Sequence, residues 1–136
     1  MTRTARDERG QSVSVFVVLV SAAIMMTAGL VVDGGQQVTA ASRAEAAAAG
    51  AARAAGNAAA TQALAGSSSA ATAVTAAQAY LAGQPGVRGR VSLDRGIVSV
   101  RTTSSAPTLF LSVVGIDTVT GQGSAQANLV ATGQVR

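Results

Sequence analysis

The sequence predicts an α+β protein: an N-terminal transmembrane helix that continues into an Ala-rich helix, then a small module of one helix and about three antiparallel strands. Residues 13–32 contain no charged side chain, and twenty helical residues span roughly 30 Å, the thickness of a bilayer's hydrocarbon core. Residues 40–65 include sixteen alanines among 26 positions, and Ala is the strongest helix former. From residue 87 onward, apolar and polar residues alternate, as in half-buried strands.

The boundaries that follow are a tail or leader at 1–12, a transmembrane helix at 13–32, an Ala-rich extracytoplasmic helix at 33–66 and an α+β module at 67–136. Val13, Val20 and Val32 stand at the start, middle and end of the apolar run, and we expect them to carry membrane insertion.

Basic residues predict the orientation of this single span. Arg3, Arg6 and Arg9 precede the apolar run, whereas the first basic residue after it is Arg43. Because Arg near a span stays on the cytoplasmic side, we expect a cytoplasmic N-terminus and an extracytoplasmic C-terminal region in the cell membrane.

A secretory signal peptide is the alternative. Val38, Thr39 and Ala40 form a small-residue pattern that signal peptidase accepts. Cleavage after Ala40 would release a protein that binds wall polymers or other extracellular partners. The apolar run is longer than the usual 7–15 residues of a signal peptide, which favours retention.

Beyond the span, Gly34 and Gly35 weaken the helix, and Asp33 is a candidate cap for a new helix. We expect some bending at Gly50 and Gly56, since Gly disfavours helix. Two compatible roles fit this stretch: a stalk that lifts the distal module off the membrane, or a helix that packs its small residues against copies or partners.

The distal elements are read from local signals. Residues 70–82 form a helix, with candidate N-caps at 67–69. Strands at 87–93 and 97–102 flank a turn at 94–96, and 103–107 is loop. Residues 108–115 form a short apolar helix capped at Gly115. A strand at 117–130 is interrupted by Gly121 and Gly123.

The chain has few of the residue types that catalysis usually requires. The chain of 136 residues has no Cys and no His, which excludes disulfides, Cys- or His-based zinc sites and nucleophiles activated by His. The acids beyond the span fall in four separate elements, at Asp33, Glu45, Asp94 and Asp117. We therefore expect no enzyme, no catalytic residue, no cofactor and no metal.

The charge balance is basic, with a net charge of +4 and Arg as its only source of basic side chains. Arg88, Arg90, Arg95 and Arg101 gather around the predicted hairpin as a candidate anion-binding patch for wall polymer or lipid headgroups. A solvated hairpin face is the simpler interpretation. Aromatic residues make up 2% and none lies among these arginines, so we expect no nucleic-acid partner.

Residues 6–55 resemble the TadE/TadG-like proteins of the Tad (Flp) pilus system. The matching features are Arg9 and Gly10 before the apolar run, the stretch from Leu30 to Gly34 at its end, and the Ala-rich continuation. The resemblance implies a minor pilin or pilus-assembly protein in the cell envelope. Its partners would be membrane lipid, other pilin-like subunits or assembly components, and copies of itself.

The resemblance also implies a candidate processing site, because prepilin peptidase cuts after Gly, here Gly10, to leave Gln11 as the new N-terminus. Mature pilins usually have Glu at their fifth position, where this chain has Val15. That difference implies the TadG-like branch, whose members commonly lack the Glu and stay anchored. An uncharged residue there leaves nothing unsatisfied in lipid.

Overall fold

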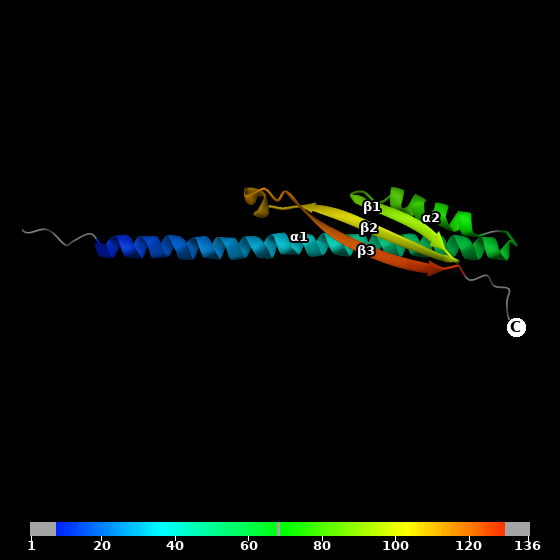
Figure 1. Cartoon of the computed structure of the whole chain (residues 1–136), viewed down its shortest axis with the longest axis horizontal. Coiled ribbons are helices and arrows are strands. Elements are labelled where there is room, and N and C mark those ends of the chain that lie inside the picture. Colours follow the sequence, from blue (N-terminus) through cyan, green and yellow to red (C-terminus); the bar gives the residue numbers. More distant parts are fainter. Residues whose placement is uncertain (1–7, 68, 130–136) are drawn as a thin grey trace, which may run out of the picture.

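The computed structural model describes residues 8–67 and 69–129 and confirms the α+β class. The elements follow in this order: α1 (Glu8–Leu64), α2 (Ala70–Ala82), β1 (Val87–Asp94), β2 (Ile97–Pro107), the 3-10 helix η1 (Leu111–Val114) and β3 (Thr118–Asn128). The three strands form one antiparallel sheet in the order β1-β2-β3. This sheet and α2 lie along the C-terminal half of α1, while its N-terminal half projects away from them (Figure 1).

Helix α1 is continuous for 57 residues, about 85 Å at 1.5 Å per residue. The expected cap at Asp33 is wrong, because the helix passes through Asp33, Gly34 and Gly35 without a break. Each Gly costs about 1 kcal/mol relative to Ala, whereas a break would leave four N–H and four C=O groups without helical partners. Gly10 and Gln11 lie near the start of α1; Arg3 and Arg6 lie outside the described residues.

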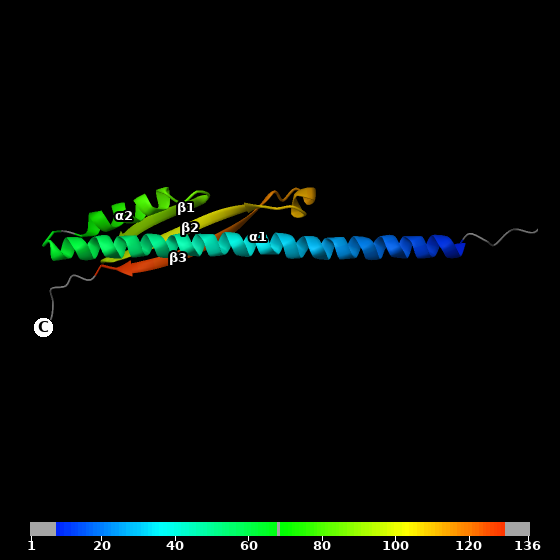
Figure 2. The ribbon, with the colours of Figure 1, turned by 180° about the vertical axis from the view of Figure 1, so that it is seen from behind.

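The C-terminal half of α1 presents a stripe of buried alanines to the sheet and α2. Figure 2 shows the sheet and α2 lying along this half of the helix. The stripe repeats every three or four residues, as one face of a helix does. Its members are Ala40, Ala44, Ala47, Ala48, Ala51, Ala52, Ala55 and Ala59. The stalk hypothesis is therefore wrong about position: the distal module lies beside this helix and is not lifted by it.

Glycines in β3 let the strand approach α1 closely. A β-carbon at Gly121 would overlap the backbone of Ala41, and one at Gly123 would overlap the backbone of Ala44. The predicted interruption of the strand at these glycines is wrong. Strand β3 is continuous and pairs with β2 along its whole length. Small residues on both sides allow backbone to rest on backbone. The expected strand end at Val130 lies outside the described residues.

Helix α2 matches its predicted range and buries Ala73, Ala77 and Leu81. Ser69 is its N-cap residue but makes no side-chain capping bond, and Ser68 lies outside the described residues. Tyr80 is 38% exposed. Its ring reaches the position that a side chain at Gly50 would occupy, so this Gly accommodates Tyr80 within a continuous helix.

The hairpin forms as predicted, and its turn uses Arg95 and Gly96 with φ of 47° and 78°. Two positive φ angles are typical of the type I′ turn that suits the twist of a hairpin. Residues 103–107 are strand and not loop, because they pair with the first residues of β3. Local pattern could not show that distant partner. The predicted helix at 108–115 is reduced to η1, which ends at Gly115 with φ 86°.

The core is thin. Its largest fully buried apolar side chains are Val98 and Val100 of β2, which lie among the alanines of α1 and α2. Thr102 also points inward from β2, and its hydroxyl donates to the carbonyl of Ala44 at 2.7 Å. Close backbone approach replaces bulky side chains as the means of filling this interior.

Candidate functional site

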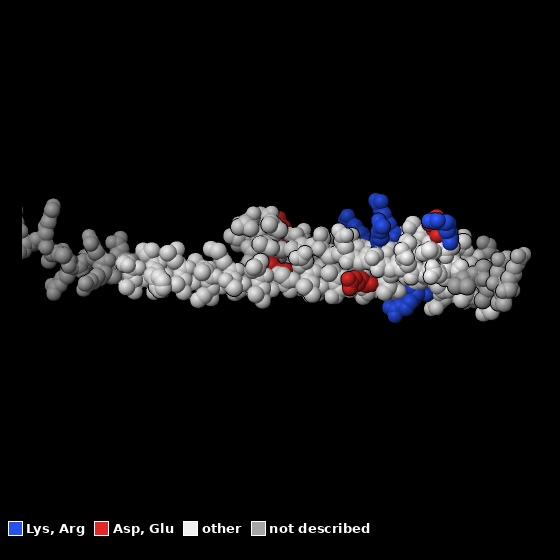
Figure 3. Space-filling view, turned by 60° about the horizontal axis from the view of Figure 1, so that its bottom comes forward, with Lys and Arg blue, Asp and Glu red and all other residues white. Residues whose placement is uncertain are grey.

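The projecting half of α1 is the most apolar surface of the described chain. Large side chains from Val13 to Val32 are 39–73% exposed, and Figure 3 shows no charged side chain on the described part of this half, whereas charges gather on the sheet-bearing half. Among the described residues, one helix is long and apolar enough to cross a membrane, and it lies near the N-terminus. Val13 and Val20 lie on this surface, and Val32 lies at its C-terminal end.

A carboxylate connects this half to the sheet. Asp33 is 1% exposed and accepts three backbone hydrogen bonds from the loop between β2 and β3. The N–H of Leu109 donates to Oδ1 at 2.8 Å, and the N–H groups of Phe110 and Leu111 donate to Oδ2 at 3.1 and 2.6 Å. These N–H groups stand at the start of η1, where no helical carbonyl can accept them. Asp33 thus caps a helix 76 to 78 residues further along the chain.

These bonds lower the pKa of Asp33. The largest cause is the N–H of Leu109; desolvation opposes it, and the N–H groups of Leu111 and Phe110 add to the lowering. A carboxylate that accepts several backbone N–H bonds is held in its charged form. Asp33 is therefore ionised at neutral pH and acts as a fixed acceptor for the loop.

Gly29, one turn before Asp33, completes this docking site. A β-carbon at Gly29 would lie 2.7 Å from Cγ of Phe110, closer than atoms pack. Gly29 and Asp33 both fall on the helix face that, further on, carries the buried alanines. We call Gly29, Asp33 and the backbone of residues 109–111 the docking site. Sequence reasoning missed it; the one signal available was an acidic residue within an uninterrupted helical pattern, with no local partner.

The candidate anion-binding arginines divide into two places. Arg90 of β1 pairs directly with Arg101 of β2, and Arg88 stands two residues before Arg90, on the same face by strand period. These three are exposed on the sheet face turned away from α1. Arg95 lies in the turn instead and forms an ion pair with Asp94 at 3.3 Å. The structure thus brings three of the four together.

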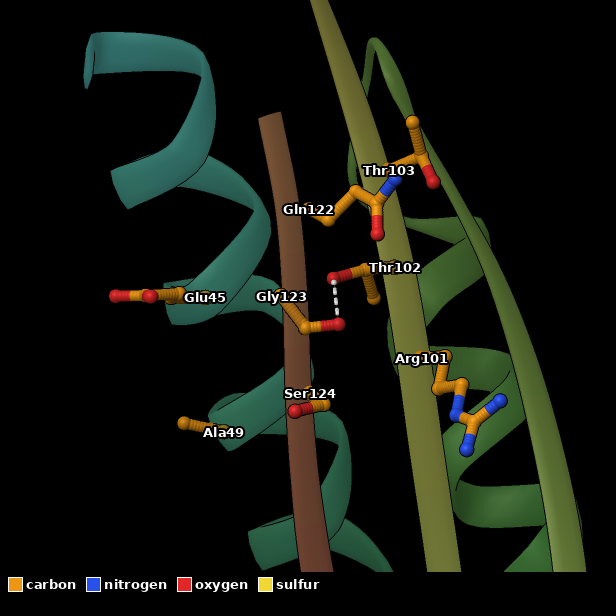
Figure 4. A pocket seen from close by; sticks show the side chains of 8 residues that line it. All are labelled: Glu45, Ala49, Arg101, Thr102, Thr103, Gln122, Gly123 and Ser124. Atoms are coloured by element: carbon orange, nitrogen blue, oxygen red, sulfur yellow. Dashed lines mark hydrogen bonds between the residues drawn. The ribbon is translucent and has the colours of Figure 1, made fainter. Parts of the chain in front are cut away.

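A groove beside β3 joins Glu45 and Ala49 of α1 to Arg101, Thr102 and Gln122 (Figure 4). Gly123 and Ser124 of β3 also line it. Glu45 points away from the sheet on one side and Arg101 on the other (Figure 4), so the groove holds no paired acid and base. Within the part of the chain that the structure describes, no three His, Cys, Asp or Glu side chains group to hold a metal.

Comparison with family models, with curated proteins and with solved structures finds no match for this chain.

Proposed function

We propose that this chain is a structural, non-catalytic protein of the cell envelope: a membrane-anchored, TadE/TadG-like minor pilin or pilus-assembly protein. The N-terminus lies in the cytoplasm, residues 13–32 cross the membrane, and the sheet-bearing half stands outside. The observation that carries the proposal is the projecting half of α1, a run of exposed apolar side chains on a helix continuous with a folded module.

This run of exposed apolar side chains is unfavourable in water. Each large apolar side chain left exposed forgoes the free energy of transfer out of water, about 1.5–3 kcal/mol when burial is complete. A bilayer supplies the missing burial, and so does lateral packing against similar helices within a bilayer or filament. Continuity matters for both. Because one helix forms the anchor and the spine of the module, a force or contact on the anchor reaches the sheet without a flexible linker.

The secreted alternative fits the geometry less well. Ala40 is 1% exposed and lies within α1 under the sheet. A mature chain beginning at residue 41 would lack Asp33, so the N–H groups of residues 109–111 would lose the acceptor described above. It would also lose Ala40 and the close backbone approach there. These contacts favour a chain that keeps its anchor.

The first test is the N-terminal residue and intact mass of the native protein, measured separately in membrane and medium fractions. We expect the membrane fraction to contain the protein, beginning at Met1 or Thr2 for a permanent anchor, or at Gln11 after prepilin-type processing. Protein in the medium beginning at Ala41 would overturn the proposal in favour of the secreted form.

A second test addresses assembly with pilin-like subunits or copies. Because the chain has no Cys, a single Cys in place of Val17 reports contacts of the projecting half alone. We expect oxidation in native membranes to join the introduced thiols of two Val17→Cys chains in a disulfide, or to join one of them to another subunit whose own span carries a Cys at the contact. A matched Ala60→Cys chain, exposed near the other end of α1, is the control. Absence of any cross-link around the full turn from residue 15 to 18 would contradict assembly through this helix.

A further inference from the structure

The loop between β2 and β3 is a second exposed apolar surface. Between Arg101 and Asp117 the chain has no charged residue, and the segment from Leu109 to Ile116, here called the apolar loop, carries mostly large apolar side chains. Val113 is 86% exposed and Val114 72%, and Leu109, Phe110 and Ile116 are 47–63% exposed. A soluble loop usually consists of polar, Gly and Pro residues, so this composition requires a reason.

Its position supplies one. The docking site holds the apolar loop against α1 at Gly29 and Asp33, so the loop lies where the charge-free run ends. Gly29 precedes Val32 by three residues, about 5 Å along the helix axis, and Phe110 packs on it. In Figure 1 the loop is the part of the sheet-bearing half that reaches furthest toward the projecting half of α1.

Many backbone polar groups of the apolar loop already have hydrogen-bond partners within the protein, as a water-poor environment requires. Asp33 accepts the N–H groups of residues 109–111. Within the loop, the N–H of Ile116 donates to the carbonyl of Leu111 at 3.0 Å, and that of Val113 to the carbonyl of Phe110 at 3.2 Å. The hydroxyl of Ser112 donates to the carbonyl of Leu109 at 2.8 Å, and that of Thr108 to the carbonyl of Ile116. In lipid, polar groups must find partners within the protein.

We propose that the apolar loop is a second membrane-contacting element, which inserts Val113, Val114 and their apolar neighbours among the acyl chains of the outer leaflet beside α1. The inference rests on the anchor proposed above. Continuity with the charge-free run of α1 selects lipid as the occupant, because a span ending near Val32 places this loop at the level of the membrane surface. No arginine lies in the loop, so apolar burial and not headgroup charge drives the contact.

With two contacts, at α1 and at the loop, the sheet-bearing half is held at a fixed height and tilt relative to the bilayer. A single helix alone leaves rotation about its axis and tilt free. The arginines Arg88, Arg90 and Arg101 would then face outward at a constant distance from the membrane.

Single cysteines in the full chain test the inference, since no native Cys interferes. Val114→Cys places an environment-sensitive nitrobenzoxadiazole label in the loop, Val20→Cys in the span, and Asn128→Cys at the far end of β3. Each labelled protein is reconstituted in phosphatidylcholine vesicles, with and without lipids that carry a nitroxide on the acyl chain, either near the headgroup or near the chain end. Emission and quenching do not depend on which way the protein inserts.

We expect the Val114 label to emit at shorter wavelength than the Asn128 label and to lose at least half of its emission to nitroxide lipid. Replacing part of the lipid by phosphatidylglycerol should leave this quenching unchanged. If the Val20 label is quenched and the Val114 label behaves like the Asn128 label, the anchor stands and the loop inference fails. A Val114 label shielded from water but not quenched by lipid would show that protein, such as a second copy, covers the loop, and would also overturn it. An unquenched Val20 label would contradict the anchor itself.

Discussion

The two halves of α1 have the same backbone and opposite surfaces. Up to Val32 the helix carries Val, Leu, Ile, Met and Phe side chains that remain exposed, and beyond it the buried face is almost entirely Ala. Bulky residues without a partner indicate a helix that the surrounding medium must cover. Alanines allow the strands to approach so closely that Gly121 and Gly123 must lack side chains. The size of the side chains, and not helix propensity, therefore distinguishes the projecting half of α1 from the half that supports the sheet.

Asp33 marks the junction between the two halves. It is the first charged residue after the apolar run, and it binds the apolar loop through three backbone N–H groups. If the comparison is right, substitutions before this residue should alter membrane retention. Those after it should alter the packing of the sheet.

The largest effect is expected for Val20→Arg. An Arg at the centre of a span costs about 2.5–3.5 kcal/mol on insertion scales, so we expect the carbonate-resistant membrane fraction to fall at least tenfold. Ala60→Arg, on the exposed face of the other half, is the matched control and should leave retention unchanged. Equal retention of both variants would show that residues 13–32 do not anchor the chain.

The next largest effect is expected for Gly123→Ala, which places a β-carbon into the backbone of α1 at Ala44. Overpacking of this kind costs about 1–3 kcal/mol, and because backbone must move, we expect a value at the upper end. The free energy of unfolding, measured with denaturant in detergent, should fall accordingly. Gly34→Ala, with no atom within 4 Å of the added carbon, should instead raise it by about 1 kcal/mol.

Docking of the apolar loop should depend on pH. The pKa of Asp33 is lowered in the folded protein, so its carboxylate stabilises docking above the unfolded-state pKa of about 4. That contribution is lost as the pH falls through the folded-state pKa. We expect hydrogen-exchange protection factors at residues 109–111 to fall when the pH is lowered from 7 to 2.5, while those of β2 change less.

Asp33→Asn removes the charge and turns one acceptor oxygen into a donor. We expect this variant to show low protection at residues 109–111 at both pH values. High protection in the variant would mean that Phe110 and Gly29 hold the loop without the carboxylate.

The smallest effects on the free energy of unfolding are expected for substitutions of two buried hydroxyl groups of β2. Thr102 donates to the carbonyl of Ala44 at 2.7 Å, whereas the buried hydroxyl of Ser104 has no partner among the described residues. Thr102→Val should lower the free energy of unfolding by about 1 kcal/mol, the usual net value of one hydrogen bond. Ser104→Ala should leave it unchanged or raise it slightly. A loss on Ser104→Ala equal to that of Thr102→Val would mean that Ser104 also bonds across this interface.

The sequence by itself determined the elements whose causes are local. Periodicity and composition predict the charge-free run, the Ala-rich helix, α2 and the hairpin with its turn, and these predictions are confirmed at the level of the fold. Strand period alone also places Arg88 and Arg90 on one sheet face, whereas the strand register of the folded hairpin sets Arg101 opposite Arg90. The lack of His and Cys in the chain limits the chemistry that any arrangement of its residues can perform.

Only the tertiary structure decided where the distal module lies and what Asp33 does. Residues 103–107 became strand because β3 pairs with them, and the glycines of β3 turned out to be contact points because α1 passes beneath them. The sequence predicted Asp33 to be a helix N-cap, because the side chain of an N-cap usually accepts a backbone N–H about three residues further along the chain. Its actual partners are 76 to 78 residues away, and no local pattern records a bond that forms only when a distant loop returns to the helix.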